Sequence, residues 1–503
     1  MPASSTSKPL PLLHRLAIAY LLLPVAVFLL GWFQWWLALP FTVLLVIAIS
    51  PLLRGPWRPD LSRDRLLRHA AILGLALAWL MLTGAGGVFD TNTNADWIKN
   101  DAILLDMSRS PWPTLLPTEG NRPEPLLRYY LGYYMVPALA GRWLGAAALN
   151  WAVPLWTFAG TGLLALLFAR HFRGWAVLLA LAILMLFSGM DILRVLLLQD
   201  LDGIHFGRSH IEWDYGQGLH VQYSSNMVGL MYVPQHFIAT GLYCLLLLEL
   251  RQHRGLLGAC GVLFAACLFW SPFVAIGLLP LLLVLLADHG LRPFLSWQNF
   301  LAAVPLAILL LVYLFSGSAN FPQGWLWEKY TAGQLLAWLP LFFFNQFGLL
   351  ALLLWVLRPE LRRDGLFHAA LATLLLLPWY HYGYFNDLAM RASLPALFLL
   401  CYFSAETICR DWPQGMLARP RGALLTLFIV LCAGAVTPAF EVARVLNFDD
   451  GQRRRYEQLE YSTLITVHRF FRGQYAARNM PGWYASLLRE HESRGTVDKD
   501  KND

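Results

Sequence analysis

The feature that most constrains this chain is a series of apolar runs, many close to twenty residues long, that recur along most of its length. A helix of about 20 apolar residues crosses the roughly 30 Å of hydrocarbon in a bilayer, and a helix satisfies its own backbone hydrogen bonds there. Hydrophobic residues make up 57% of the 503 residues, and charged residues only 14%. The sequence therefore predicts an all-α polytopic membrane protein.

About fourteen apolar segments are candidates for membrane helices. They lie near residues 15–34, 37–53, 70–88, 129–145, 150–169, 176–197, 237–250, 256–271, 273–287, 300–316, 335–357, 366–380, 393–409 and 422–439. Between two loops that face the same side, the chain must cross an even number of times. We therefore expect about thirteen true spans, with segment 129–145 lying in the interface or re-entering.

The distribution of charge between these segments predicts the topology. Short connectors rich in arginine follow four of the apolar regions, at 54–69, 251–254, 358–364 and 410–422. Such connectors face the cytoplasm under the positive-inside rule, so the net charge of +7 reports topology and is no evidence for nucleic acid. Longer loops at 89–128, 199–236, 317–333 and 381–392 then face outward. We divide the chain into a transmembrane domain, 1–440, and a polar tail, 441–503, expected on the same outward side.

The first outward loop, 89–128, gathers acidic residues directly after an apolar run. The stretch NADWIKNDAILLDM predicts a short amphipathic helix in which Asp96, Lys99 and Asn100 share one face. A carboxylate there can act as a general base or hold a divalent cation. The alternative is that Asp90 and Asp96 only cap helices. We expect Asp101 and Asp106 to be solvated or capping residues.

The second outward loop, 199–236, mixes acidic residues and histidines with aromatic rings. His210 and Glu212 lie close to Trp213 and Tyr215, a composition that suits sugar hydroxyls and sugar CH faces. A metal site is the alternative, although the histidine spacing typical of helical metal sites is absent from this loop. His236 precedes an apolar span, so it either joins the substrate site or makes interfacial hydrogen bonds.

A third feature is the pair Asp387 and Arg391, at positions i and i+4 where a span begins. A structural ion pair explains this spacing. The alternative is that Arg391 binds the phosphate of a lipid-linked substrate, because its planar guanidinium matches phosphate and its depth matches a lipid headgroup.

Taken in order, these pieces resemble the GT-C superfamily of integral-membrane glycosyltransferases. The resemblance covers residues 70–200 in some detail, through DTNTNADWIKNDAILLD, SPWP and RPEPLLRYYLGYYMVPALAGRWLG, and the rest of the chain only in topology. It implies that Asp96 is the catalytic acidic residue, with Asp90 second, and that Arg391 engages the donor phosphate. Two extra apolar segments precede the acidic loop here, and DTNTNAD replaces the usual acidic pair. Family members differ in metal dependence, so the need for Mg²⁺ or Mn²⁺ stays open.

The resemblance implies a glycosyltransferase of the bacterial cytoplasmic (inner) membrane with its active site on the outer face. It would move a sugar from a polyprenyl-phosphate-linked donor to an envelope glycan, lipid or protein. Tyr129 and Tyr130, with His210, Glu212 and His236, would shape the sugar site. The alternatives are a transporter or flippase of lipid-linked glycans or another amphiphile, and a non-catalytic membrane scaffold. Nearly charge-free spans favour the enzyme, because transporters place ionisable residues at the bilayer midplane.

Overall fold

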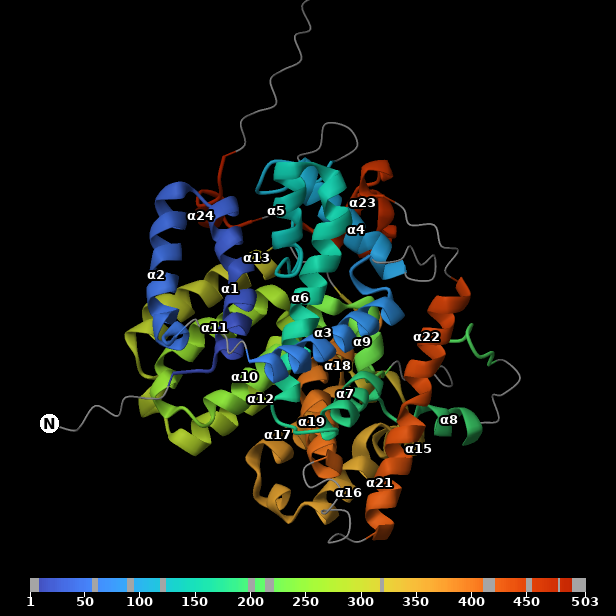
Figure 1. The fold of residues 1–503 in the computed structure, drawn as a ribbon. Coiled ribbons are helices and arrows are strands. Elements are labelled where there is room, and N and C mark those ends of the chain that lie inside the picture. Colours follow the sequence, from blue (N-terminus) through green and yellow to red (C-terminus); the bar gives the residue numbers. More distant parts are fainter. Residues whose placement is uncertain are drawn as a thin grey trace, which may run out of the picture.

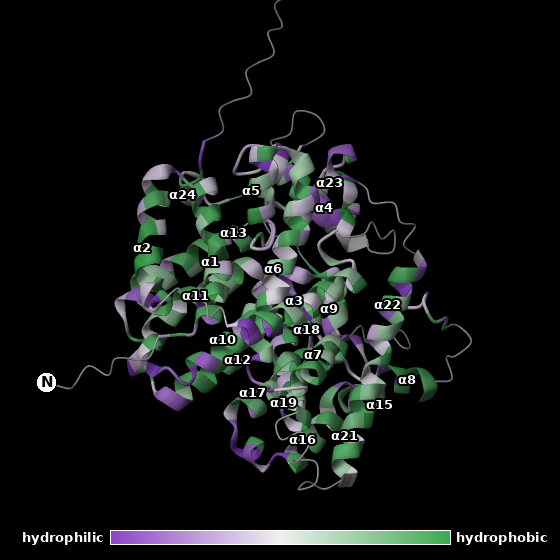
Figure 2. Ribbon diagram, viewed as in Figure 1, coloured by the Kyte–Doolittle hydropathy of each residue, from purple (hydrophilic) through white to green (hydrophobic). Residues whose placement is uncertain are grey.

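The computed structural model describes residues 9–56, 62–87, 95–117, 124–197, 204–212, 221–316, 321–409, 421–448, 455–477 and 480–490. Within these ranges the chain is almost entirely helical, and its strands are two or three residues long (Figure 1). Figure 2 shows that hydrophobic residues dominate the long helices, while hydrophilic residues gather at α4 (Ala95–Arg109) and in connecting loops. The all-α fold expected from the apolar runs is confirmed.

Nine helical stretches in the described residues are long and apolar enough to cross a membrane. They are α1 (Leu12–Trp32), α2 (Trp35–Leu53), α3 (Arg63–Thr83), η2 with α6 (Ala146–Ala169), α12 (Pro272–His289), η5 with α13 (Gln298–Phe315), α15 to α16 (Ala332–Leu357), α18 with α19 (Asp387–Cys409) and α21 with α22 (Gly422–Asn447). A bent pair, α7 (Ala176–Leu186) and α8 (Asp191–Leu197), makes a tenth if it is one span; the two helices meet at 52°.

The expectation of about thirteen spans is not confirmed, because several apolar segments form helices shorter than a bilayer. Segment 129–145 contains α5 (Met135–Leu144), whose 10 residues extend only about 15 Å. Arg142, near the end of α5, donates a hydrogen bond to the carbonyl oxygen of Ser110 in the first loop. The end of α5 therefore lies beside the first loop, and its expected re-entrant or interfacial placement stays a prediction. The segments near 256–271 and 366–380 also form short apolar helices, Arg254–Trp270 and Gly365–Trp379.

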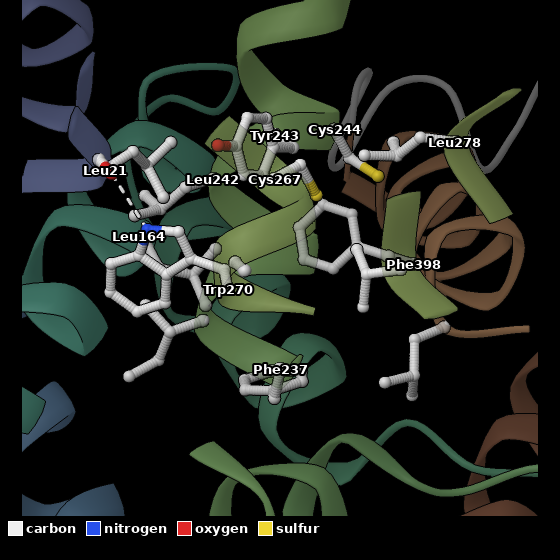
Figure 3. Close-up of a cluster of buried hydrophobic side chains, with 14 of the residues drawn as sticks. Leu21, Leu164, Phe237, Leu242, Tyr243, Cys244, Cys267, Trp270, Leu278 and Phe398 are labelled. Carbon is white, nitrogen blue, oxygen red and sulfur yellow. Dashed lines mark hydrogen bonds between the residues drawn. The ribbon is translucent and has the colours of Figure 1, made fainter. Parts of the chain in front are cut away.

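The core of the bundle surrounds α10 (Pro234–Leu250), which is buried on almost every side. Figure 3 shows aromatic and aliphatic side chains from α10 meeting those of neighbouring helices, with Trp270 donating a hydrogen bond of 2.8 Å to the Leu21 carbonyl oxygen. Gly241 permits this packing, because a Cβ there would lie 2.3 Å from a methyl carbon of Leu164. Such a closely packed central helix fixes the positions of the loops at its two ends.

The four loops expected on one face do come together at one end of the bundle. Strand β2 (Gln323–Trp325) pairs with β3 (Tyr380–Tyr382), which joins the third loop to the start of the fourth. Strand β1 (Leu126–Leu127), from the first loop, pairs with β4 (Ala476–Ala477), from the C-terminal region. In Figure 1, α4 and α23 (Thr463–Thr466) lie side by side at this end.

The C-terminal region differs from the separate polar tail that we expected from residue 441. The last candidate span continues to Asn447, because α22 (Val436–Phe448) extends the apolar helix past position 440. Residues 455–477 then pack on the first loop. Arg128, buried and 4% exposed, holds this segment by donating hydrogen bonds to the carbonyl oxygens of Gly473 and Gln474.

Two acidic residues of α4 also form hydrogen bonds with the C-terminal segment. Of the two expectations for Asp106, solvated or capping, the first is wrong: its side chain is buried and accepts hydrogen bonds from the Thr463 amide (2.9 Å) and the Ser462 hydroxyl (3.2 Å). Burial raises the pKa of Asp106. Asp101 accepts a hydrogen bond of 2.5 Å from the Tyr456 hydroxyl. These contacts attach the C-terminal segment to the loop that carries the predicted catalytic residues.

The described parts of the arginine-rich connectors at 54–69, 251–254 and 358–364 lie at the opposite end of the bundle. His14, at the start of α1, lies 2.9 Å from Arg170 after α6, whereas Trp32, at the end of α1, accepts a hydrogen bond from the Arg489 amide of the C-terminal region. At the connector end, Arg251 forms ion pairs with Asp288 (2.6 Å) and Asp364 (3.1 Å). Basic connectors at one end and long polar loops at the other are the arrangement that the positive-inside rule predicts.

Candidate functional site

The loop end of the bundle encloses a cavity of about 640 Å³. Its walls come from α4, the segment after β1, α9 (Asn226–Tyr232), α18 (Asp387–Ala392), α22 and the C-terminal segment. Side chains with polar or charged groups that line it include Lys99, Tyr129, Tyr130, His210, Gln222, Tyr232, Asp387, Arg391, Arg444, His468 and Tyr475. The cavity lies near the ends of several candidate membrane helices. Residues that are far apart in the sequence therefore line the same cavity.

Tyr129 and Tyr130 form the centre of one wall. Their ring centroids lie 3.7 Å apart with 32° between the ring planes, and the Tyr129 hydroxyl donates a 2.5 Å hydrogen bond to that of Tyr130. Arg391 donates a hydrogen bond of 2.9 Å from Nη1 to the Tyr130 hydroxyl. Tyr475, from the C-terminal segment, packs against the other side of this pair, 5.0 Å from the Tyr129 ring centroid.

The turn before α18 determines the position of Arg391. Asn386 adopts a left-handed conformation (φ 56°), which asparagine tolerates, and its side chain accepts a hydrogen bond from the Ala389 amide. Asp387 then lies one helical turn before Arg391, and its carboxylate is 3.0 Å from Nη2 of the guanidinium. The expected ion pair is therefore present, and it leaves Arg391 at the cavity wall. Asp387 and Tyr130 together fix the direction of the guanidinium.

Lys99 adds a second permanent positive charge on the same wall. Its Nζ lies 5.7 Å from the centroid of the Tyr129 ring, a cation–π distance. The next residue in α4, Asn100, points away from the cavity and accepts a hydrogen bond of 2.7 Å from the Tyr134 hydroxyl. Because Lys99 and Arg391 flank the stacked tyrosines, this wall favours an anionic ligand.

His236 supports the tyrosine pair from behind. Its ring centroid is 4.8 Å from that of Tyr130, and its Nδ1 shares a 2.6 Å hydrogen bond with the Ser271 hydroxyl. The side chain is fully buried and does not line the cavity. The structure therefore places His236 as a packing neighbour of Tyr130, out of reach of a ligand in the cavity.

A second polar group lies around Glu441 of α22. Its carboxylate is 2.7 Å from Nδ1 of His210 and 3.3 Å from Arg444, and Arg444 also donates a 2.6 Å hydrogen bond to the Tyr232 hydroxyl. Burial lowers the pKa of His210, but the hydrogen bond and charge of Glu441 outweigh burial and leave that pKa above its usual value. Arg444 therefore places a further positive charge at the cavity, paired with the Glu441 carboxylate.

Glu212 is close to His210 in sequence but does not line this cavity. It is buried, and its carboxylate accepts 2.5 Å and 2.6 Å hydrogen bonds from the Ser225 amide and the Gln222 side chain. Burial raises the pKa of Glu212 to about 7. Its hydrogen bonds turn Glu212 towards the interior, so its predicted role at the sugar site stays a prediction.

The structure thus brings together six of the residues predicted from the sequence and places three others behind the cavity. Lys99, Tyr129, Tyr130, His210, Asp387 and Arg391 line it, and Asn100, Glu212 and His236 do not. Asp96 lies in the first turn of α4, three residues before Lys99, and nothing is described of its side chain. Asp90 lies outside the described residues.

Sequence reasoning missed the contribution of the chain beyond residue 440. Arg444, His468 and Tyr475 all line the cavity, although they lie in what we expected to be a separate tail. One available signal was the spacing of Glu441 and Arg444, which are i and i+3 in a helix continuing an apolar span. For His468 and Tyr475 no local pattern exists, because strand pairing and the Arg128 hydrogen bonds bring them to the cavity.

Three or more His, Cys, Asp or Glu side chains arranged to hold a metal ion are not found in the described part of the chain. Comparison with protein-family models, curated proteins and solved structures gives no match for this sequence. The chemistry of the cavity therefore rests on its own residues. The protein is a polytopic all-α membrane protein whose loops enclose a cationic, aromatic cavity.

Proposed function

We propose that this protein is a membrane glycosyltransferase that takes a sugar from a polyprenyl-phosphate-linked donor. The observation that carries the proposal is the wall on which Arg391 and Lys99 flank the stacked pair Tyr129 and Tyr130. It combines phosphate-binding charge with aromatic faces at the ends of apolar helices. The positive charge suits a lipid phosphate, and the aromatic faces suit a sugar ring. The nearby apolar helices suit a lipid tail.

Arg391 would hold the donor phosphate. A guanidinium forms paired hydrogen bonds to phosphate, and Asp387 and Tyr130 already orient this one, so little side-chain entropy is lost on binding. Lys99 would stabilise the negative charge that accumulates on the phosphate as the glycosidic bond breaks. His210 and Arg444 lie further round the cavity and would contact other anionic or hydroxyl groups.

The transfer step requires a base near the acceptor. Asp96 would remove the proton of the acceptor hydroxyl or amine. The oxygen or nitrogen of the acceptor then bonds to the anomeric carbon of the sugar, while the bond from that carbon to the phosphate oxygen breaks. Polyprenyl phosphate then leaves with both electrons of that bond. Asp96 precedes Lys99 by three residues in α4, and Asp90 is the second candidate.

The resemblance to GT-C enzymes adds the setting of this proposal. It places the reaction on the outer face of the bacterial cytoplasmic membrane, with an envelope glycan, lipid or protein as acceptor. The positive connectors at the opposite end of the bundle support this orientation. Asp90 and Asp96 are the acidic residues of the first loop that would hold a Mg²⁺ or Mn²⁺ ion, should the reaction use one.

Replacement of Asp96 by Asn tests the proposal. Purified Asp96→Asn protein should bind a polyprenyl-phosphate sugar with unchanged affinity and transfer it at least about a hundredfold more slowly, because general-base catalysis contributes this much or more. The matched control is Asp64→Asn, at the exposed start of α3. Transfer at the wild-type rate by Asp96→Asn would reject Asp96 as the base, and failure of the wild-type protein to bind the lipid donor would reject the function.

A transporter or flippase of lipid-linked glycans is the second candidate, and one observation favours it. Asp191 is buried at the break between α7 and α8 and accepts a hydrogen bond from Gln346 in η6 (Phe344–Gly348), a π-helical turn inside a candidate span. Transporters place ionisable residues at such helix breaks. Movement of a fluorescent lipid-linked sugar across proteoliposomes that contain no acceptor would support this alternative over the enzyme.

A further inference from the structure

A second cavity of about 20 Å³ lies beside the break between α7 and α8, separate from the large one. Asp191 and Glu212 line it together with Arg194, Asn345 and Gln346. About 10–15 Å³ suffices for one water-sized body, so the space admits a single small occupant. In Figure 1, α8, α15 and α22 lie together on this side of the bundle, and α8 contacts both η6 and α22.

The helix break and the π-helical turn are built against each other. The Met190 amide donates a 2.9 Å hydrogen bond to the backbone carbonyl oxygen of Asn345. Gly189 lies so close to η6 that a Cβ there would be 2.4 Å from Oε1 of Gln346. Irregular backbone inside a helical membrane bundle is tolerated only where its polar groups form hydrogen bonds or line a site. Two irregular turns in direct contact therefore indicate a constructed polar site inside the bundle.

Both carboxylates already accept hydrogen bonds from the protein. Asp191 accepts 2.6 Å and 2.8 Å hydrogen bonds from Nε2 of Gln346 and the Thr437 hydroxyl. Glu212 accepts from Gln222 and from the Ser225 amide. Further oxygen atoms are then left over: Oδ1 of Asn345 and Oε1 of Gln346 are buried and have no hydrogen-bond partner among the described residues, and their side chains are only 5% and 8% exposed.

We propose that this small cavity binds a monovalent metal cation of the size of Na⁺, with oxygen ligands from Asp191, Glu212, Asn345 and Gln346. All candidate ligand atoms are carboxylate or amide oxygens, which hard cations prefer. Each of these amide oxygens would gain a partner, whereas burying a polar group without one is unfavourable.

The size of the cavity favours a monovalent ion. Asp191 and Glu212 supply negative charge, and the Arg194 guanidinium in the same lining offsets part of it. Mg²⁺ keeps several of its waters, and a cavity of about 20 Å³ has no room for them.

The cation would also connect to the large cavity. Gln222 donates a hydrogen bond from Nε2 to Glu212 and itself lines the large cavity. An ion that fixes Glu212 would therefore fix part of the ligand-binding wall. This inference goes beyond the proposed transferase reaction and holds whether or not the sugar is transferred.

Binding of radioactive ²²Na⁺ to the purified full-length protein in detergent tests the proposal directly. Ionic strength is kept constant with choline chloride, so that general salt effects cancel. We expect saturable binding of about one ion per chain, and an affinity lowered about tenfold or more in Asp191→Asn and in Asn345→Leu. The control is Asp106→Asn, another buried carboxylate, which should bind Na⁺ like the wild-type protein.

Three results would overturn the proposal: no saturable Na⁺ binding by folded wild-type protein, wild-type affinity in both variants, or displacement of Na⁺ by equimolar Mg²⁺. If Asp191→Asn fails to yield monodisperse protein, Asn345→Leu and Gln346→Met decide the question, because they remove amide oxygens and leave the carboxylate pair. Lipid-donor binding measured on the same samples separates this test from that of the proposed function.

Discussion

The guanidinium of Arg391 donates a hydrogen bond of 2.9 Å to the hydroxyl of Tyr130, a residue 261 positions earlier in the chain. Asp387 holds the same guanidinium from its own helix. This contact joins the loop at 381–392 to the segment that follows the loop at 89–128. It places a permanent positive charge beside a stacked aromatic pair, and the first two predictions follow from it.

Replacing Arg391 by Ala should weaken binding of polyprenyl phosphate at least about tenfold, because a charge-assisted hydrogen bond contributes on the order of 1.5–3 kcal/mol. Arg391→Lys should recover only part of the loss, since an ammonium lacks the planar fork. The measurement is lipid-phosphate affinity in detergent. Arg362→Ala is the control, because Arg362 stacks on Trp355 and does not line the cavity. Undiminished affinity in Arg391→Ala would exclude the phosphate role.

Replacing Tyr130 by Phe should weaken the same binding by a smaller factor. The variant keeps the ring stack with Tyr129 and loses the hydroxyl that accepts from Arg391, a net contribution of about 1 kcal/mol, or roughly fivefold in affinity. Tyr243→Phe, in the core away from the cavity, is the control. An effect as large as that of Arg391→Ala would mean that the Tyr130 hydroxyl contacts the ligand itself.

The pH dependence of stability should change when Glu212 is replaced by Gln. Burial raises the pKa of Glu212 from 4.5 to about 7, so between these values the folded protein binds more protons than the unfolded chain. Stability therefore falls as pH rises from about 4.5 to about 7, and the ionised carboxylate costs on the order of 3 kcal/mol above that range. Thermal midpoints of Glu212→Gln in choline chloride should fall less over this range.

In the Glu212→Gln protein, a separate decline of stability with rising pH should remain, because His210 also titrates. The pKa of His210 is raised by Glu441, so its contribution is present below its usual pKa of 6.5 and is lost as pH rises through the higher folded value. Parallel pH profiles for wild type and Glu212→Gln would show that the Glu212 carboxylate does not titrate in this range.

Gly189→Ala should destabilise the protein by about 1–3 kcal/mol, because the new methyl group would lie 2.4 Å from Oε1 and 3.0 Å from Cα of Gln346. The helix break and η6 would have to separate. Gly333→Ala is a matched control, since a Cβ there meets nothing within 4 Å and alanine favours the helix. Thermal unfolding in detergent compares the two, and equal midpoints would show that the break tolerates separation.

Asp106→Ala should release the C-terminal segment from α4. It removes the acceptor for the Thr463 amide and the Ser462 hydroxyl, and loss of a buried hydrogen-bonded partner costs about 1–3 kcal/mol. Limited proteolysis should cut the 455–477 region faster, while Asp64→Ala, at an exposed position, should behave like wild type. Unchanged cleavage would show that strand pairing and Arg128 hold the segment without Asp106.

The sequence by itself determined the membrane class, most of the helices and the set of loops that meet. Apolar length and the distribution of arginine act through local transfer energies, so they can be read one segment at a time. The same locality explains the correct i, i+4 pair of Asp387 and Arg391. The expected number of spans is not confirmed, because apolar composition alone does not distinguish a helix of bilayer length from a shorter one such as Gly365–Trp379.

Only the tertiary structure decided which polar residues share a cavity. Glu212 and His210 are two residues apart, yet one turns to an interior pocket and the other lines the large cavity, because each follows its hydrogen-bond partners. The C-terminal segment reaches the cavity through β1 and Arg128, contacts between residues more than 340 positions apart. The polar cluster at Asp191 depends on a helix break meeting a π-helical turn. Non-local hydrogen bonds of this kind leave no periodic trace in the sequence.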